Sequence, residues 1–218
     1  LIFFISFLLI FLVVSQSPAI ARYASIVVDE QTGKVLHASN PDRQRYPASL
    51  TKMMTLYMVF DALDRGKIKL NQRLKVSRRA QGMAPSKLGL KRGQSITVKD
   101  AILALITKSA NDVAVVVAES LGKTEINFAK MMTRKARILG MRKTRFKNAS
   151  GLPNRRQVST ARDMAILARK LITDFPHFYH FFKTQRFNYK RRTYRNHNKL
   201  LRAYPGVDGI KTGYIRAS

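Results

Sequence analysis

Runs of β-forming residues at both ends of the chain frame a long central part with helical periodicity. Residues 24–29 (ASIVVD) and 34–38 (KVLHA) are rich in β-branched and aliphatic side chains, and the turn between them contains Gly33. This pattern predicts a β-hairpin. Near the other end, residues 186–201 alternate aromatic or aliphatic with polar side chains, and residues 209–214 carry glycines toward both ends. Both segments are predicted to form strands.

The central part of the chain is predicted to be helical. Residues 49–64 contain no Gly or Pro and place apolar residues on every face, which is typical of a helix buried in a core. Further helices, bounded by capping residues, glycine or proline, are predicted at residues 97–106, 113–121, 124–139 and 159–173. Residues 108–112 form a polar break between two of these helices.

This order of strands, helices and strands favours an α/β fold of the α+β type. The simplest arrangement is one antiparallel sheet built from both ends of the chain, flanked by helices, with an all-helical lobe inserted in the middle. We expect a sheet lobe formed by residues 22–64 and 155–218, and a helical lobe formed by residues 65–154. A chain of 218 residues suffices for one domain with two such lobes.

The first residues have the pattern of an export signal. Residues 1–14 are almost unbroken apolar, which is short for a membrane span but suits a signal peptide, and Ala19-Ile20-Ala21 has the small-x-small pattern of a cleavage site. We therefore expect residues 1–21 to be a signal peptide that lacks its own beginning, and the mature chain to start at Arg22. The alternative is an uncleaved anchor. Either predicts an exported protein, in the periplasm or at the outer face of the cytoplasmic membrane.

Two residue types limit the available chemistry. The chain contains no Cys, which excludes disulfides and thiol chemistry. The four His residues, at positions 37, 177, 180 and 197, do not form a convincing ligand set. We therefore expect no metal and no cofactor.

The net charge of +29 indicates an anionic partner. The densest basic stretch, residues 183–202, has eight Lys or Arg and no acidic residue. Such a stretch attracts nucleic acid, but an exported protein first meets anionic lipid headgroups and cell-wall polymers. We expect an anionic membrane or cell-wall surface as partner, and no specific nucleic acid.

The first candidate for chemistry is Ser49-Leu50-Thr51-Lys52, at the start of the buried helix. Residues i and i+3 of a helix share one face, about 5–6 Å apart at Cβ, so the Lys52 amine can reach the Ser49 hydroxyl. A desolvated Lys with a lowered pKa can take the proton of such a hydroxyl and make it a nucleophile. The motif alone is weak, because residues 120–123 also match it and Ser49 could be an ordinary helix cap.

Two more elements strengthen the interpretation. Ser109-Ala110-Asn111 lies in the polar break, and Lys211-Thr212-Gly213 lies on the predicted final strand, where Gly213 would let a substrate backbone approach. Each of these two patterns occurs once. The three elements follow the order, on helix, loop and strand, that serine enzymes recognising penicillin use.

With these motifs, the chain resembles the low-molecular-mass penicillin-binding proteins of the D-alanyl-D-alanine carboxypeptidase family. The resemblance extends over the surrounding residues 46–55, 104–114, 148–152, 159–164 and 207–214. It implies a DD-peptidase/β-lactamase-like fold. It also implies a serine carboxypeptidase that removes the terminal D-alanine from peptidoglycan stem pentapeptides through an acyl-enzyme, with β-lactams as covalent inhibitors.

The resemblance also implies the roles of single residues. Ser49 is expected to be the acylated nucleophile, Lys52 its general base, and Ser109 the relay that passes a proton to the leaving D-alanine. The backbone N–H groups of Ser49 and Tyr214 are expected to form the oxyanion hole. The substrate-binding residues implied are Asn111, Lys211, Thr212 and Gly213.

Two departures from the family pattern concern the C-terminal part. In the family, further strands of the sheet follow the K-T-G strand, so we expect residues 22–218 to be a catalytic domain that is truncated, with an incomplete sheet. Ile215 stands where a Thr is common, which is expected to weaken contacts to the substrate.

Three other functions compete with the carboxypeptidase. A class A β-lactamase needs a Glu between the S-x-N and K-T-G motifs to activate water, and the chain has no Glu after Glu125. An endopeptidase that cuts cross-links uses the same machinery and stays open as an alternative. A non-enzymatic, basic, exported protein that binds the cell wall would form no covalent adduct with penicillin.

Overall fold

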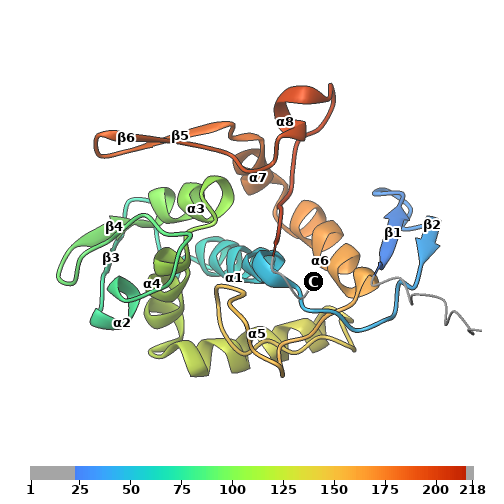
Figure 1. The fold of residues 1–218 in the computed structure, drawn as a ribbon, viewed down its shortest axis with the longest axis horizontal. Helices are drawn as coiled ribbons and strands as arrows, with labels where there is room; N and C mark the ends of the chain where they lie inside the picture. The colour runs from blue at the N-terminus through green and yellow to red at the C-terminus, as the bar shows by residue number, and fades with distance from the viewer. Residues whose placement is uncertain (1–22, 215–218) are drawn as a thin grey trace, which may run out of the picture.

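The computed structural model describes residues 23–214. One helix, α1 (Thr51–Asp64), lies in the centre of the fold, and most of its side chains are buried. Helices α3, α4, α5 and α6 all contact it, so that α1 has neighbours on all sides (Figure 1). This is the environment that a helix with apolar residues on every face requires, and the prediction of a buried helix is confirmed.

Besides α1, the helices of the described part are α2 (Arg78–Gln81), α3 (Val98–Thr107), α4 (Asn111–Gly122), α5 (Glu125–Ile138), α6 (Ala161–Asp174), α7 (Pro176–Tyr179) and α8 (Leu200–Ala203), with 3₁₀ turns η1 (Ala48–Leu50) and η2 (His180–Lys183). Of these, α3, α4, α5 and α6 begin and end close to the predicted positions, whereas the short helices α2, α7 and α8 were not predicted. Three of the predicted helices start with a threonine cap: the hydroxyls of Thr97, Thr124 and Thr160 accept from the backbone N–H three residues later, at 3.0–3.1 Å. These caps explain why the sequence signals located the helix starts.

The strands form three antiparallel hairpins. β1 (Ser25–Val28) pairs with β2 (Val35–Ser39), β3 (Arg73–Lys75) with β4 (Ser95–Thr97), and β5 (Arg186–Tyr189) with β6 (Arg192–Arg195). The first hairpin was predicted. The β3–β4 pair was not, because strands of three residues are too short to show an alternation. The mixed fold of helices and antiparallel strands is confirmed.

The expectation of one continuous sheet is wrong for the described residues. Residues 209–214 form no strand, because within residues 23–214 they find no ladder of backbone hydrogen bonds, and β1 pairs only with β2. The segment instead runs from α8 to the N-terminal end of α1 (Figure 1). Two side chains hold it: Asn198 Nδ2 donates to the Gly209 carbonyl at 2.9 Å, and the Tyr179 hydroxyl donates to Asp208 at 3.1 Å.

Other expectations are corrected or stay open. The stretch predicted as strand at 186–201 ends in the short helix α8. The division into a sheet lobe and a helical lobe stays a prediction. The expected signal peptide at residues 1–21, its cleavage before Arg22 and the departure at Ile215 lie outside the described residues. Among the helices of the described part, none has the length and apolar character needed to cross a membrane.

Candidate active site

Ser49 and Lys52 lie next to each other at the N-terminal end of α1. Ser49 belongs to the 3₁₀ turn η1, and α1 begins two residues later at Thr51. The Lys52 Nζ donates to the Ser49 Oγ at 3.2 Å. The spacing of three residues therefore places the amine within reach of the hydroxyl, as the S-x-x-K pattern predicts.

Lys52 is held by two further acceptors below the surface. Its side chain is fully buried, and the Nζ donates to Asn111 Oδ1 at 2.8 Å and to the Ser150 carbonyl at 2.5 Å. Burial lowers the pKa of Lys52 well below its usual value, and the positive charge of Lys211 lowers it further, against the opposing effect of Asp112. Lys52 therefore has the geometry and the lowered pKa that a general base needs.

The S-x-N motif lies at the junction between α3 and α4. Ser109 is buried with a positive φ of 57°, and among the described residues its Oγ has no hydrogen-bond partner. Such an unpaired buried hydroxyl is costly unless it serves a function. Asn111 is the first residue of α4 rather than part of a loop. Its Nδ2 donates to the Ala84 carbonyl at 3.0 Å, so both polar atoms of its amide have partners within the protein.

A buried carboxylate fixes the loop that faces this motif. Asp112 accepts from the backbone N–H groups of Leu88, Gly89 and Leu90 at 2.9–3.1 Å. The Asn111 N–H donates to the Ser86 carbonyl at 2.7 Å. Residues 84–90 are therefore tied to the start of α4 and form one wall beside Ser109.

The K-T-G segment lies across the turn that carries Ser49. A Cβ atom on Gly213 would lie 3.2 Å from the Leu50 backbone nitrogen and 3.4 Å from the Pro47 carbonyl oxygen, so the two segments are in tight contact. The Lys211 Nζ donates to the Thr212 carbonyl at 2.9 Å, and burial lowers the pKa of Lys211 to about 8. Tyr214 is strongly exposed.

The turn at residues 148–152 completes the site and was not assigned a role from the sequence. It supplies the Ser150 carbonyl that receives Lys52, and Gly151 packs against the backbone of Ala48. The Asn148 side chain closes the turn, because its Oδ1 accepts from the Gly151 N–H at 2.7 Å and its Nδ2 donates to the Leu152 carbonyl at 2.9 Å. The N-A-S-G-L-P sequence predicted a turn here, but a backbone carbonyl leaves no signal in a sequence.

These segments surround a cleft of about 390 Å³. Its lining residues are Ser49, Pro85, Ser86, Ser109, Asn111, Ser150, Gly151, Leu152, His197, Thr212, Gly213 and Tyr214. The structure thus brings most of the predicted site residues to one cavity, with Lys52 buried beneath Ser49. A larger and more apolar cavity of about 540 Å³ lies between β1 and α6, but Ser49 does not line it. We place the site in the smaller cleft.

His197 is a further residue of this cleft that sequence reasoning missed. From the sequence, the four histidines are expected to have packing or surface roles rather than to bind a metal. In the structure, His197 lines the cleft beside Ser49 and Ser109. Burial lowers its pKa, and the positive charges of Lys211, Lys108 and Lys52 lower it further. Within residues 23–214, no three His, Asp or Glu side chains gather into a group that could hold a metal ion.

The site contains the parts of a covalent acyl-transfer enzyme. The Ser49 hydroxyl lies beside the buried amine of Lys52, and the second hydroxyl of the cleft, that of Ser109, has no hydrogen-bond partner in the described part of the chain. The positive charge of Lys211 acts on Lys52. This arrangement on S-x-x-K, S-x-N and K-T-G motifs defines the class of penicillin-recognising serine enzymes. Residues 12–218 match the family model described as D-alanyl-D-alanine carboxypeptidase, and the chain belongs to this family. The resemblance stated from the sequence is confirmed.

Individual relatives agree with this assignment. The chain is 38% identical over 196 residues to the D-alanyl-D-alanine carboxypeptidase DacF of Bacillus subtilis (strain 168), covering 88% of this chain and 50% of that protein. The structure resembles penicillin binding protein 5 from Haemophilus influenzae, with a TM-score of 0.85, 35% identity, and coverage of 88% of this chain and 57% of that one.

A second similar structure holds a bound β-lactam. Penicillin-Binding Protein D2 from Listeria monocytogenes, in its ampicillin-bound form, gives a TM-score of 0.80 and 30% identity, covering 89% of this chain and 79% of that one. The chain spans about half the length of the curated relatives it matches.

Proposed function

We propose that the protein is a serine-type D-alanyl-D-alanine carboxypeptidase that acts on peptidoglycan stem pentapeptides and is acylated by β-lactams. The observation that carries this proposal is the Ser49 Oγ at 3.2 Å from the amine of the fully buried Lys52, beside a cleft that Ser109, Thr212 and Gly213 also line. Membership of the D-alanyl-D-alanine carboxypeptidase family supports the same reaction.

The first step forms the acyl-enzyme. Neutral Lys52 takes the Ser49 proton while the Oγ attacks the carbonyl carbon of the penultimate D-alanine. The lowered pKa of Lys52 makes the neutral amine available at moderate pH. The negative charge that develops on the carbonyl oxygen is received by the backbone N–H groups of Ser49 and Tyr214.

The second part of the reaction releases the terminal D-alanine. Ser109 passes the proton that Lys52 took from Ser49 to the amine of the leaving D-alanine as the peptide bond breaks, a role that suits a buried hydroxyl without a hydrogen-bond partner among the described residues. Lys211 and Thr212 bind the terminal carboxylate, and the absence of a side chain on Gly213 lets the substrate backbone approach. Water then hydrolyses the ester on Ser49 and restores the enzyme.

We propose two roles for Asn111, one toward Lys52 and one toward the substrate. Its Oδ1 accepts from Lys52 and its Nδ2 donates to Ala84. The Nδ2 carries a second hydrogen, with which Asn111 can donate to the substrate carbonyl on the acyl side while it keeps the Ala84 contact. We propose that it orients Lys52 in the free enzyme and contacts the substrate once the cleft is filled.

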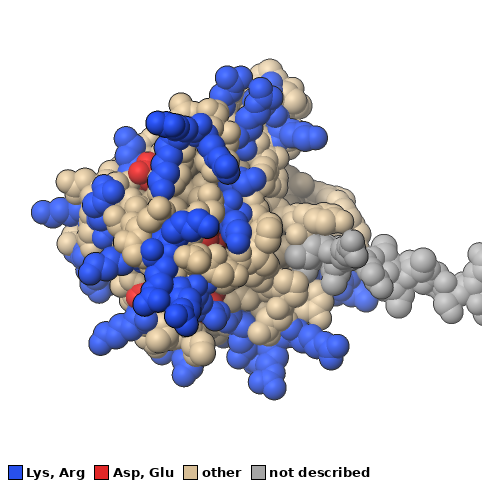
Figure 2. All heavy atoms as spheres, turned by 60° about the vertical axis from the view of Figure 1, so that its left-hand side comes forward, with Lys and Arg blue, Asp and Glu red and all other residues tan. Residues whose placement is uncertain are grey.

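The surface charge supports an anionic envelope as the second partner. Figure 2 shows Lys and Arg side chains spread over the side of the molecule that carries α2, β3 and β4, with few Asp or Glu among them. The net charge is +29, so the protein is attracted over a long range to anionic lipid or wall polymers. We propose that this attraction keeps an exported enzyme at the envelope.

The β-lactamase alternative has little support in the site. Glu125, the last Glu of the chain, is bound to Arg79 and to the Ala149 N–H, and it is not among the residues that line the cleft. It is therefore not placed to activate a water on the acyl-enzyme. The endopeptidase alternative uses the same residues and needs a direct comparison of substrates.

The test is D-alanine release from a pentapeptide ending in D-Ala-D-Ala, compared with cleavage of a cross-linked peptide dimer. The full-length protein is expected to release D-alanine, and Ser49→Ala to release none. Faster cleavage of the dimer would favour the endopeptidase. Reaction of neither substrate with a folded protein would overturn the proposal.

A further inference from the structure

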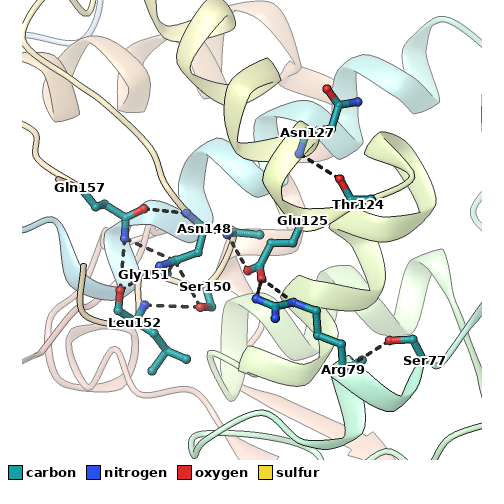
Figure 3. Close-up of polar contacts among 12 residues, drawn as sticks. Ser77, Arg79, Thr124, Glu125, Asn127, Asn148, Ser150, Gly151, Leu152 and Gln157 are labelled. Carbon is teal, nitrogen blue, oxygen red and sulfur yellow. Dashed lines mark hydrogen bonds and ion pairs between the residues drawn. The ribbon is translucent and has the colours of Figure 1, made fainter. Parts of the chain in front are cut away.

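Glu125 is a buried carboxylate that the proposed chemistry does not use. It is the first residue of α5, and its side chain is only 3% exposed. Its Oε1 accepts from the Ala149 N–H at 3.1 Å, and its Oε2 accepts from Arg79 Nε at 2.9 Å and from Arg79 Nη2. Figure 3 shows Glu125 between the Arg79 guanidinium and the 148–152 turn. One carboxylate thus joins α2, α5 and the turn beneath the cleft.

The peptide groups of this turn are held from several directions. The Ala149 carbonyl accepts from the Thr55 hydroxyl of α1 at 2.8 Å, in addition to the bond from the Ala149 N–H to Glu125. The Gln157 Oε1 accepts from the N–H groups of Lys147 and Asn148 at 2.9 and 3.1 Å. Because the turn lacks regular secondary structure, these side chains replace the ladder that a helix or strand would provide.

The next carbonyl along the turn, that of Ser150, is an acceptor for Lys52. The other two acceptors of Lys52, Ser49 and Asn111, sit at the starts of helices and are held by them. The Ser150 carbonyl belongs to the turn, and no helix or strand of the described residues contains it. A lysine amine on a flexible four-carbon stem takes one position only if all its partners are fixed.

We propose that Glu125 is a positioning residue for the general base: it anchors the Ala149 N–H and thereby fixes the Ser150 carbonyl that holds Lys52 beside Ser49. The inference rests on the proposed function, because it assumes that Lys52 activates Ser49. Glu125 itself touches neither substrate nor the reacting atoms.

A charged residue suits this task for a physical reason. A carboxylate accepts a stronger hydrogen bond from a backbone N–H than a neutral group does. Burying that charge is costly, and Arg79, whose side chain is 59% exposed, neutralises it from the solvent side. Arg79 lies in the short helix α2, which the Ser77 hydroxyl caps by accepting from the Ala80 N–H at 3.0 Å.

The competing explanation is a purely structural ion pair that ties α2 to α5. Both explanations predict a loss of stability when the pair is broken. Only the positioning role predicts that the acylation step depends on the acceptor for Ala149 rather than on the ion pair. The two are therefore separated by comparing variants of Glu125 with variants of Arg79.

The experiment measures acylation of the full-length protein by a fluorescent penicillin at several concentrations, so that the non-covalent dissociation constant and the acylation rate constant are obtained separately. The melting temperature is measured alongside. Glu125→Ala is expected to lower the acylation rate constant by about 100-fold, the usual effect of misplacing a reacting group by about 1 Å, with the dissociation constant unchanged. Glu125→Gln keeps an acceptor for the Ala149 N–H and is expected to recover most of the rate.

Arg79→Met removes the ion pair but leaves the carboxylate. It is expected to lower the melting temperature while keeping the acylation rate constant within about threefold of the original. Arg78→Met, at the neighbouring exposed position, is the matched control and is expected to change neither. If Glu125→Ala does not fold, Glu125→Asp keeps the charge but withdraws the carboxylate from Ala149, and it is expected to lose the rate.

Two results would overturn the inference: unchanged acylation in both Glu125→Ala and Glu125→Asp, or an equal loss of rate in Arg79→Met. Failure of the original protein to be labelled at Ser49 is a different result, since it would overturn the proposed function itself.

Discussion

A Cβ atom on Gly151 would lie 1.8 Å from the carbonyl oxygen of Ala48, the residue directly before Ser49. No Cβ atom can approach a backbone oxygen so closely, and Gly151 also has a φ of +85°. Ala48 has a positive φ of 47° itself. The turn that supplies the Ser150 carbonyl and the turn that supplies the nucleophile are thus packed backbone against backbone.

Gly151→Ala is expected to disrupt acylation more than it disrupts the fold. The new methyl group must push the Ala48–Ser49 backbone away, so we expect the acylation rate by penicillin to fall by about 100-fold or more. Gly140→Ala is the matched control, because Gly140 has a φ of +89° but nothing within 4 Å of an added Cβ. Gly140→Ala should lower the free energy of unfolding, measured with urea, by about 1–2 kcal/mol because of backbone strain alone, and it should leave the acylation rate unchanged. Equal acylation by the two variants would contradict this account of the contact.

Ser109→Ala is expected to lower the activity without lowering the stability. The Ser109 Oγ is buried and has no hydrogen-bond partner within residues 23–214, so its removal should leave the free energy of unfolding unchanged or raise it by about 1 kcal/mol. The reaction should lose a proton relay, and D-alanine release should fall by about 10²–10⁴-fold.

Thr144→Val provides the contrast to Ser109→Ala. The Thr144 hydroxyl is buried and bonded to Ser159 at 2.8 Å and to Asp163 at 2.6 Å, away from the cleft. This variant should lose about 1–3 kcal/mol of stability and keep its activity. A Ser109→Ala protein that is destabilised as strongly as Thr144→Val would show that the hydroxyl has a structural partner.

The pH dependence of the acylation rate should reflect the titration of two lysines, Lys52 and Lys211. Acylation requires neutral Lys52, so the rate should rise with pH as Lys52 loses its proton at a pKa well below the usual value for lysine. It should fall again as Lys211, with a pKa of about 8, loses the charge that attracts the penicillin carboxylate.

Lys211→Met tests the assignment of these two limbs. Without the charge of Lys211, the alkaline fall should disappear, and the acidic limb should move to higher pH because one cause of the lowered Lys52 pKa is gone. The measurement is the second-order rate of acylation across the pH range. An unchanged alkaline limb in Lys211→Met would assign that limb to another group.

Local sequence patterns predicted individual residues of this site better than the contacts between segments that are distant in the sequence. Ser49 and Lys52 are brought together by three residues of local spacing, and threonine caps at 97, 124 and 160 mark the helix starts, so both could be found from local patterns. Five of the twelve residues that line the cleft belong to the S-x-x-K, S-x-N and K-T-G motifs and were located by that joint pattern.

What the sequence missed depends on contacts between distant segments. The Ser150 carbonyl lies 98 residues from Lys52, and its role is played by a backbone atom that every residue possesses. The glycine-bounded segment 209–214 was predicted as a strand because its composition permits one, but a strand also needs a neighbour to pair with. The role of Glu125 arises only from the fold, where α5 brings it beneath the turn.

The most direct test of the central claim is the site of penicillin attachment. The full-length protein is incubated with a fluorescent penicillin, its intact mass is measured, and the labelled peptide is sequenced by mass spectrometry. We predict one adduct, on Ser49, which is absent from Ser49→Ala and strongly reduced in Lys52→Ala. A folded protein that forms no adduct, or one labelled equally in Ser49→Ala, would contradict the assignment of Ser49 as the nucleophile.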